Sequence, residues 1–152
     1  MRPIKLEIRA IAREYNISDH NGSAYSLIFL IYTKGTMNQE ITGENYRIVY
    51  HSDTTTIDFC GVLRLAGMSE YEEIDRLLTE VASTKPDRMT LNFEKLEFLN
   101  SSGFSVLSKF AISMRQQKDT EIVTIASEDI PWQAKSFKNL KRLLPNLTVE
   151  FK

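Results

Sequence analysis

The chain has 152 residues, of which 42% are hydrophobic and 26% are charged, and its 19 basic and 20 acidic residues leave a net charge of −1. This length predicts one globular domain, and the composition excludes collagen-like, coiled-coil and wholly disordered proteins. A near-neutral charge gives no electrostatic reason to expect nucleic acid as a partner. Proteins and small molecules therefore remain the partner classes to consider.

The sequence also indicates in which cellular compartment the protein is expected. Its single cysteine, Cys60, can form neither an internal disulfide nor a zinc cluster. The first ten residues carry charges where a signal peptide needs an apolar core, and the most apolar run, residues 27–32, is far shorter than the roughly 20 residues that span a bilayer. We therefore expect a cytoplasmic protein without a membrane partner.

Two strands joined by a tight turn are predicted from residue 46 onward. Tyr46, Ile48 and Tyr50 alternate with polar residues, and residues 51–53 interrupt this pattern. Residues 54–59 are then rich in β-branched side chains, which favour a second strand.

The first predicted helix has recognisable ends. Ser69 and Glu72 have the spacing of a capping box, in which the serine oxygen accepts from a free amide and the glutamate reaches back. Apolar residues then recur at helical spacing from Tyr71 to Val81. The helix has to stop before Pro86, because proline disfavours the α conformation in the residue that precedes it.

Downstream of this helix, strands and helices alternate. A strand, a helix and another strand form a βαβ unit, which implies parallel strands and a right-handed crossover. The fold class is therefore α/β. The predicted elements are a strand marked by Met89, Leu91 and Phe93, from which residues 96–99 lead on to residue 100, a helix over 104–114, a strand over 121–126, a helix from Pro131 to Pro145 and an edge strand over 147–151.

The residue pattern predicts no enzyme. The two histidines, His20 and His51, do not stand at metal-ligand spacings, and the six glycines are scattered singly, so no phosphate-binding loop is present in the sequence. The acidic residues between Glu70 and Asp75 most simply form a solvated helix face that complements the helix dipole. We therefore expect no catalytic residue, no metal ligand and no cofactor.

Residues 91–110 differ from the rest, because Asn-Ser-Ser-Gly stands at the junction of a strand and a helix. In a structural interpretation, Ser101 or Ser102 is the N-cap of the helix and Gly103 permits a close or strained turn. In a functional interpretation, the junction exposes a hydroxyl beside free amide donors, where the helix dipole favours a phosphate group. The residues alone leave both interpretations open.

This segment, LNFEKLEFLNSSGFSVLSKF, resembles the signature of the STAS domain, which occurs in anti-sigma factor antagonists and in sulphate-transporter tails. In that family an apolar strand leads into D-S-S-G-L-x-V-L, and residues 98–107 follow the pattern closely. Residues 57–65 are similar to the family's strand that ends in l-x-G-x-L, and the order of elements agrees over about two-thirds of the chain. The resemblance implies a STAS-like domain over residues 43–152, with a mixed central β-sheet packed by α-helices.

The remaining residues, 1–42, are assigned to an N-terminal extension. Ile4, Leu6 and Ile8 alternate as in a strand, whereas Ile4, Ile8 and Ile11 fit a helix, and Asn21-Gly22 is typical of a hairpin turn. Residues 1–36 have no counterpart in the resemblance. We expect a loosely attached extension or a start upstream of the native one, with an added hairpin as the alternative.

The resemblance implies a non-catalytic regulator that acts by partner switching. The family's phosphorylated serine corresponds to Ser101, which is flanked by Asn100, Ser102 and Gly103, with Asn100 standing in place of the family's aspartate. The implied partners are an anti-sigma factor or serine kinase of the GHKL ATPase type, and a serine phosphatase. The segment after Gly61 lacks an acidic residue common in the family, which indicates a divergent subgroup of cyanobacterial type.

Two surfaces are predicted to contact the partner. Ser101, Phe104 and Ser105 form the first, where phosphate would add negative charge and disfavour the complex. Lys138 and Arg142, on the polar side of the last helix, are either a solvated face or a rim contact to an acidic partner. The alternative function is a small-ligand or nucleotide-binding sensor on the same fold, in which the serine is only a helix cap.

Overall fold

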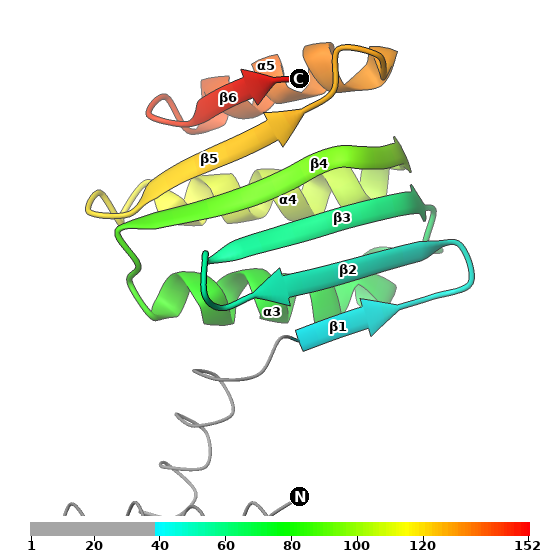
Figure 1. The fold of residues 1–152 in the computed structure, drawn as a ribbon, viewed down its shortest axis with the longest axis horizontal. Coiled ribbons are helices and arrows are strands. Elements are labelled where there is room, and N and C mark those ends of the chain that lie inside the picture. The colour runs from blue at the N-terminus through cyan, green and yellow to red at the C-terminus, as the bar shows by residue number, and fades with distance from the viewer. Residues whose placement is uncertain (1–38) are drawn as a thin grey trace, which may run out of the picture. The chain divides into compact units, whose positions relative to one another are not determined.

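A computed structural model describes residues 39–152. The strand, helix and hairpin interpretations of the first 38 residues, with the boundary at Met37, lie outside the described residues. Within the described range, six strands form one sheet in the order β1 to β6 (Figure 1). The elements are β1 (Gln39–Thr42), β2 (Tyr46–His51), β3 (Thr56–Leu63), the 3-10 helix η1 (Met68–Tyr71), α3 (Glu72–Ser83), β4 (Arg88–Leu99), α4 (Ser101–Met114), β5 (Glu121–Ala126), α5 (Pro131–Leu143) and β6 (Thr148–Phe151).

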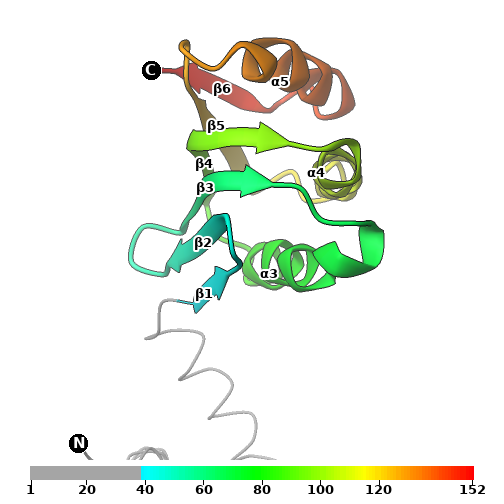
Figure 2. The same cartoon turned by 90° about the vertical axis from the view of Figure 1, so that its right-hand side faces the viewer.

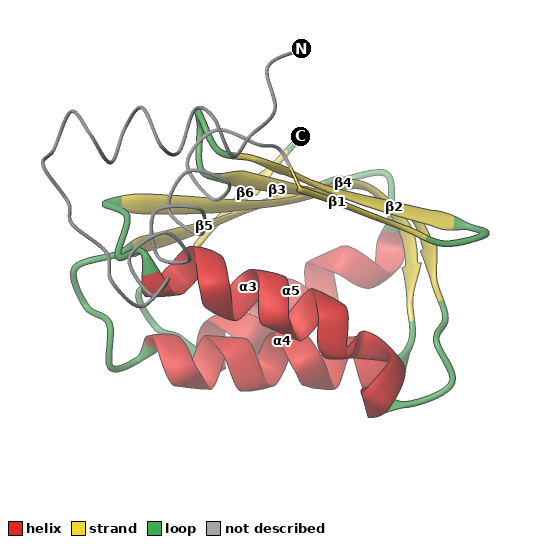
Figure 3. Ribbon diagram, turned by 90° about the horizontal axis from the view of Figure 1, so that it is seen from below, coloured by secondary structure: helices red, strands yellow, loops and turns green. Residues whose placement is uncertain are grey.

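The sheet is mixed, and its helices lie on one face. β1, β2 and β3 pair antiparallel, whereas β3, β4, β5 and β6 pair parallel. Each parallel connection moves one strand further in the same direction, so right-handed crossovers place every connecting helix on the same side. Figure 3 shows α3, α4 and α5 covering that side, and Figure 2 shows α4 between the other two. The predicted α/β class with a mixed sheet is confirmed.

The hydrophobic core lies between the sheet and the helix layer. Alternate residues of β4 point into it, namely Met89, Leu91 and Phe93, each at most 1% exposed. The ring of Phe93 stacks on Phe59 at 4.6 Å and contacts Phe137 of α5 at 4.9 Å between centroids. These contacts join β3, β4 and α5, and they confirm the apolar periodicity predicted for these elements.

The sheet begins earlier than the sequence predicted. β1 falls within residues 1–42, the segment assigned to the N-terminal extension, and it precedes the first predicted strand, which begins at Tyr46. Ile41 is its buried residue, and it pairs with Ile48 of β2 on the core side. A four-residue strand with one apolar side chain carries too weak a period to be recognised from the sequence.

The start of the first helix also differs. The predicted capping box does not form, because η1 precedes α3 and neither helix has a side-chain cap. Instead, Glu70 Oε2 accepts from the Ala66 amide at 2.9 Å and holds the loop that enters η1. The predicted stop before Pro86 is confirmed, since α3 ends at Ser83.

β4 is longer than its neighbours and is held at its far end by α5. It has 12 residues, yet it pairs with β5 only over Arg88–Asn92. Its pairing with β3 shifts register at two points. Beyond β5, Gln133 Nε2 donates to the carbonyls of Phe93 and Leu96 at 2.7 and 2.9 Å, and Trp132 Nε1 donates to that of Glu97 at 2.8 Å. The first turn of α5 thus replaces a neighbouring strand.

The sheet face opposite the helices carries a row of polar contacts. His51 Nε2 lies 2.9 Å from Asp58 Oδ2, and Asn92 Nδ2 donates to Asp58 Oδ1 at 3.0 Å, so the row joins β2, β3 and β4. Within residues 39–152, no group of three or more histidine, cysteine or carboxylate side chains could hold a metal ion. No helix in the same range is both long and apolar enough to cross a membrane.

Candidate functional site

The junction between β4 and α4 lies at the carboxyl end of a parallel strand, where open α/β sheets commonly bind their ligands. α4 begins at Ser101, and its N-cap is Asn100, whose side chain accepts from the Gly103 amide at 3.0 Å. The expectation that Ser101 or Ser102 caps this helix is therefore wrong. Asparagine is as good an N-cap as serine, and it leaves both hydroxyls free of this role.

Asn100 also ties the helix start to two other segments. Its Oδ1 accepts from the Tyr71 hydroxyl at 2.6 Å, and its Nδ2 donates to the Leu65 carbonyl at 2.8 Å. Its amide donates to the Leu63 carbonyl at 3.1 Å. An aspartate could accept the first of these bonds, but it has no N–H to donate to Leu65. Asparagine at position 100 thus makes a bond to Leu65 that an aspartate could not make.

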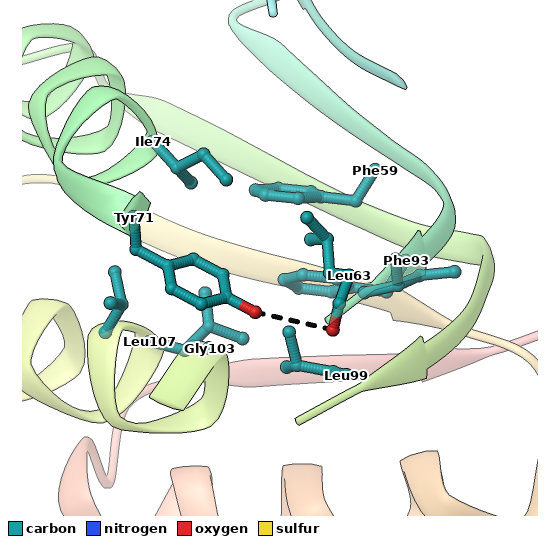
Figure 4. Close-up of a pocket in the computed structure, with 10 residues that line it drawn as sticks. Phe59, Leu63, Tyr71, Ile74, Phe93, Leu99, Gly103 and Leu107 are labelled. Carbon is teal, nitrogen blue, oxygen red and sulfur yellow. Dashed lines mark hydrogen bonds between the residues drawn. The ribbon is translucent and has the colours of Figure 1, made fainter. Parts of the chain in front are cut away.

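Gly103 allows the helix to approach Tyr71 closely. A Cβ at this position would lie 2.3 Å from Leu99 Cδ1 and 2.8 Å from Tyr71 Oη, which is closer than real Cβ contacts come. Figure 4 shows Gly103 between these two side chains. Tyr71 is 1% exposed, and burial raises the pKa of its hydroxyl. The hydroxyl therefore keeps its proton, which it can donate to Asn100 Oδ1 at 2.6 Å or to the Leu63 carbonyl at 3.3 Å.

A small apolar cavity lies under the first turns of α4 (Figure 4). Its volume is about 10 Å³, the space of about one water molecule, whereas small-molecule sites have several hundred Å³. A larger, partly open hollow of about 490 Å³ lies between the β1–β2 turn and the end of β3, lined by residues that include Glu44, Tyr46 and Arg64. The cavity under α4, at about 10 Å³, is therefore too small for a nucleotide.

The first turn of α4 brings three predicted site residues together. Ser101 and Ser105 are exposed, Phe104 is half-buried, and Ser105 Oγ donates to the Ser101 carbonyl at 2.9 Å. The amides of Ser101 and Ser102 have no acceptor among the described residues. This surface, which we call the α4 entry surface (Ser101, Phe104 and Ser105), therefore offers a hydroxyl beside free backbone donors at the positive end of a helix dipole.

Lys138 and Arg142 lie elsewhere. Both are exposed on α5, and their neighbour Leu143 accepts a hydrogen bond from Arg115, just after the last residue of α4. α4 has 14 residues and spans about 20 Å, so this contact is at the opposite end of the helix from Ser101. The structure does not bring these two cations to the α4 entry surface.

Sequence reasoning missed the residues that support the junction. Tyr71 fits the apolar helix pattern, and nothing in that pattern indicates a bond from its hydroxyl to Asn100. Gln133 carried a usable signal, because it precedes Phe137 and Leu140 at helical spacing and is therefore a polar residue on a buried face. Its side chain is fully buried, with its oxygen accepting from the Ser127 amide at 2.7 Å.

No family model and no curated protein matches this chain by sequence. Among solved structures, the chain is similar to SiaC of Pseudomonas aeruginosa at 9% identity and a TM-score of 0.60, over 77% of this chain and all of that one. It is also similar, at 10% identity and a TM-score of 0.60, to a chain in the crystal structure of diguanylate cyclase SiaD in complex with its activator SiaC from the same organism. The second match covers 75% of this chain and 99% of that chain. At these identities the likeness concerns the fold alone, and it confirms the predicted STAS-like α/β architecture.

Proposed function

We propose that this protein is a non-catalytic regulator that binds a protein partner through the α4 entry surface and is switched by phosphorylation of Ser101. The partner is an anti-sigma factor or serine kinase of the GHKL ATPase type, and a serine phosphatase removes the phosphate. Phosphate adds between one and two negative charges to a surface that otherwise contacts the partner with neutral groups. The complex then weakens through repulsion and desolvation.

The observation that carries this proposal is the exposed Ser101 at the first position of a firmly capped helix. Because Asn100 makes the cap, the serine hydroxyl is available for modification without loss of the helix start. The free amides of the first turn and the helix dipole favour negative charge there. A phosphate is therefore tolerated by the fold, and its effect falls on the partner.

The fold comparison supports regulation by protein binding. SiaC is described as the activator of diguanylate cyclase SiaD and was crystallised in complex with it. A domain of this fold can thus act on an enzyme by contact. Since fold does not fix function, the comparison supports the class of mechanism and leaves the partner to be identified by experiment.

Phosphate incorporation and partner binding test the proposal together. After incubation with the cognate kinase, mass spectrometry should find phosphate on Ser101, and Ser101→Ala should abolish it while preserving partner binding. Ser101→Asp should weaken binding, and the matched control Ser102→Ala should leave both readouts unchanged. Phosphate on another residue, or unaltered binding by Ser101→Asp, contradicts the switch.

A further inference from the structure

The outer side of α5 is a basic ridge. Lys135, Lys138 and Arg142 are exposed and follow one another at i, i+3 and i+7, so they lie on one side of the helix. The helix contains four basic residues and no acidic one. Among residues 39–152, these three cations make no ion pair. We call them the α5 ridge.

α3 carries the opposite charge at the other side of the helix layer. It has four acidic residues and a single basic one, Arg76. Asp75 is engaged by Lys109 of α4 at 3.7 Å, which leaves Glu72, Glu73 and Glu80 as the acidic set. α4 separates the two charged helices (Figure 2). The layer is therefore electrically polarised, although the whole chain has a net charge of only −1.

α4 contributes an apolar contact between the two charged helices. Ile112 is 47% exposed, and it lies one turn from Arg115, the residue that contacts the end of α5. An order of acidic helix, apolar residue and basic helix is self-complementary under two-fold rotation. A two-fold axis that runs parallel to α4 past Ile112 sets α3 of each copy against α5 of the other, so the favourable pairing occurs twice.

We propose that the helix layer is a homodimer interface, in which the α5 ridge of one copy binds the acidic set of α3 in a second copy. The complementary charge is present on the same chain, and a net charge near zero leaves little overall repulsion between copies. The proposal gives Lys138 and Arg142 an acidic partner, and it does not rest on the proposed function. Ser101 lies at the N-terminal end of α4, and Ile112 lies near the other end.

Two charge-reversed variants of the full chain test this interface. The first, Lys135→Glu/Lys138→Glu/Arg142→Glu, makes the α5 ridge acidic, and the second, Glu72→Lys/Glu73→Lys/Glu80→Lys, makes α3 basic. Sedimentation should give the wild type a mass approaching twice 17.5 kDa at low ionic strength, falling to 17.5 kDa at high salt. Each variant alone should remain at 17.5 kDa, and an equimolar mixture should recover the dimer.

The control reverses the same number of charges outside the two helices, as Lys95→Glu/Lys118→Glu/Lys152→Glu, and should dimerise like the wild type. Circular dichroism checks that every variant is folded. A wild type that is monomeric at high concentration and low salt overturns the proposal. So does a mixture of the two variants that stays monomeric while both are folded. Both measurements use protein that has not been exposed to a kinase, so they are made separately from the test of Ser101.

Discussion

The hydroxyl of Tyr71 donates to Asn100 Oδ1 at 2.6 Å and joins two residues that are 29 positions apart in the sequence. Tyr71 ends η1, and Asn100 is the N-cap of α4, so the start of one helix is fixed by the end of another. A buried phenol requires a hydrogen-bond partner, and a cap oxygen has room for a second donor. The bond satisfies the Tyr71 hydroxyl and the Asn100 side-chain oxygen together, and it fixes the start of α4 against the end of η1.

Replacement of Asn100 should separate its capping role from its role toward a kinase. Asn100→Ala removes the bonds to Tyr71, Leu65 and Gly103, and should lower the free energy of unfolding by about 2 kcal/mol. Asn100→Asp keeps the two acceptor bonds and sets a carboxylate against the Leu65 carbonyl, so we expect a smaller loss. Urea unfolding of both variants measures this order, which equal stabilities would contradict.

The same Asn100→Asp variant tests the role of the missing carboxylate. If a neighbouring carboxylate helps a kinase to orient the Ser101 hydroxyl, the variant should incorporate phosphate faster than the wild type. If this position only holds the turn, the two rates should agree. Time courses of phosphate incorporation, compared at equal folded fraction, distinguish the outcomes.

Gly103→Ala should destabilise the protein by about 1 to 3 kcal/mol, because the added methyl group meets Leu99 and the Tyr71 hydroxyl at distances that require repacking. Ser102→Ala is the matched control one position earlier. The helix cap is Asn100, so this substitution should change stability by less than about 0.5 kcal/mol. Thermal unfolding measures both variants. A loss of about 1 kcal/mol of unfolding free energy in Ser102→Ala would show that Ser102 caps the helix after all.

The stability should fall at alkaline pH through Tyr71. Burial raises the pKa of this hydroxyl above its ordinary value of 10.0, so folding retains a proton that the unfolded chain loses. The free energy of unfolding is therefore unaffected by Tyr71 below pH 10, and decreases as the pH rises toward the folded-state pKa. Tyr71→Phe should be less stable by about 1 kcal/mol at neutral pH, with a shallower alkaline decrease. Burial also raises the pKa of Tyr50, so a residual slope should persist in the variant.

Gln133→Leu should be among the most damaging substitutions, because it leaves the Phe93 and Leu96 carbonyls and the Ser127 amide without their partner. We expect a loss of about 3 kcal/mol or more. Trp132→Phe, which removes only the bond to the Glu97 carbonyl, should cost about 1 kcal/mol. The single tryptophan of the chain reports on the same region, so its fluorescence should shift in Gln133→Leu. An unchanged melting temperature in that variant would contradict this role.

Two truncations test the domain boundary. Removal of residues 1–36 should leave the melting temperature nearly unchanged. Removal of residues 1–42 also deletes β1, and with it the buried Ile41, whose burial contributes roughly 1.5 to 3 kcal/mol. A drop of many degrees in the first truncation would place earlier residues in the folded core. Equal melting temperatures for both would show that β1 contributes nothing.

The elements that periodicity predicted are those with several core residues in regular positions. β2, β3 and the three helices satisfy this condition, and the helix that begins at Pro131 was recognised from its first residue. The register shifts between β3 and β4 could not be predicted, nor could the bonds from Gln133 to the Phe93 and Leu96 carbonyls, which lie about 40 residues earlier. Hydrophobic pattern is local, whereas these bonds are made only in the folded chain.

The candidate site also has features that the local sequence predicts and features that only the folded chain determines. Asn-Ser-Ser-Gly identifies the junction, and the close approach at Gly103 agrees with the close turn that this glycine predicts. The choice of capping residue was wrong because Asn, Ser and Ser are all good N-caps, and only the fold decides which of them is in place. Tyr71 and Leu65, whose bonds hold the Asn100 side chain in place, lie in other segments of the chain.

The polar contacts on the sheet face opposite the helices help to fix the register of the strands. On the side of the helices, buried side chains penalise a slip of register. On the opposite side, the contacts of Asp58 with His51 and Asn92 add to this penalty. His51, Asp58 and Asn92 bond across three strands, including the change from antiparallel to parallel pairing. Because successive side chains alternate between faces, a slip of one residue would turn Asp58 into the core and break both of its bonds at once. This half-exposed carboxylate thereby reinforces, by polar contacts, the alignment of β2, β3 and β4 that the hydrophobic face sets.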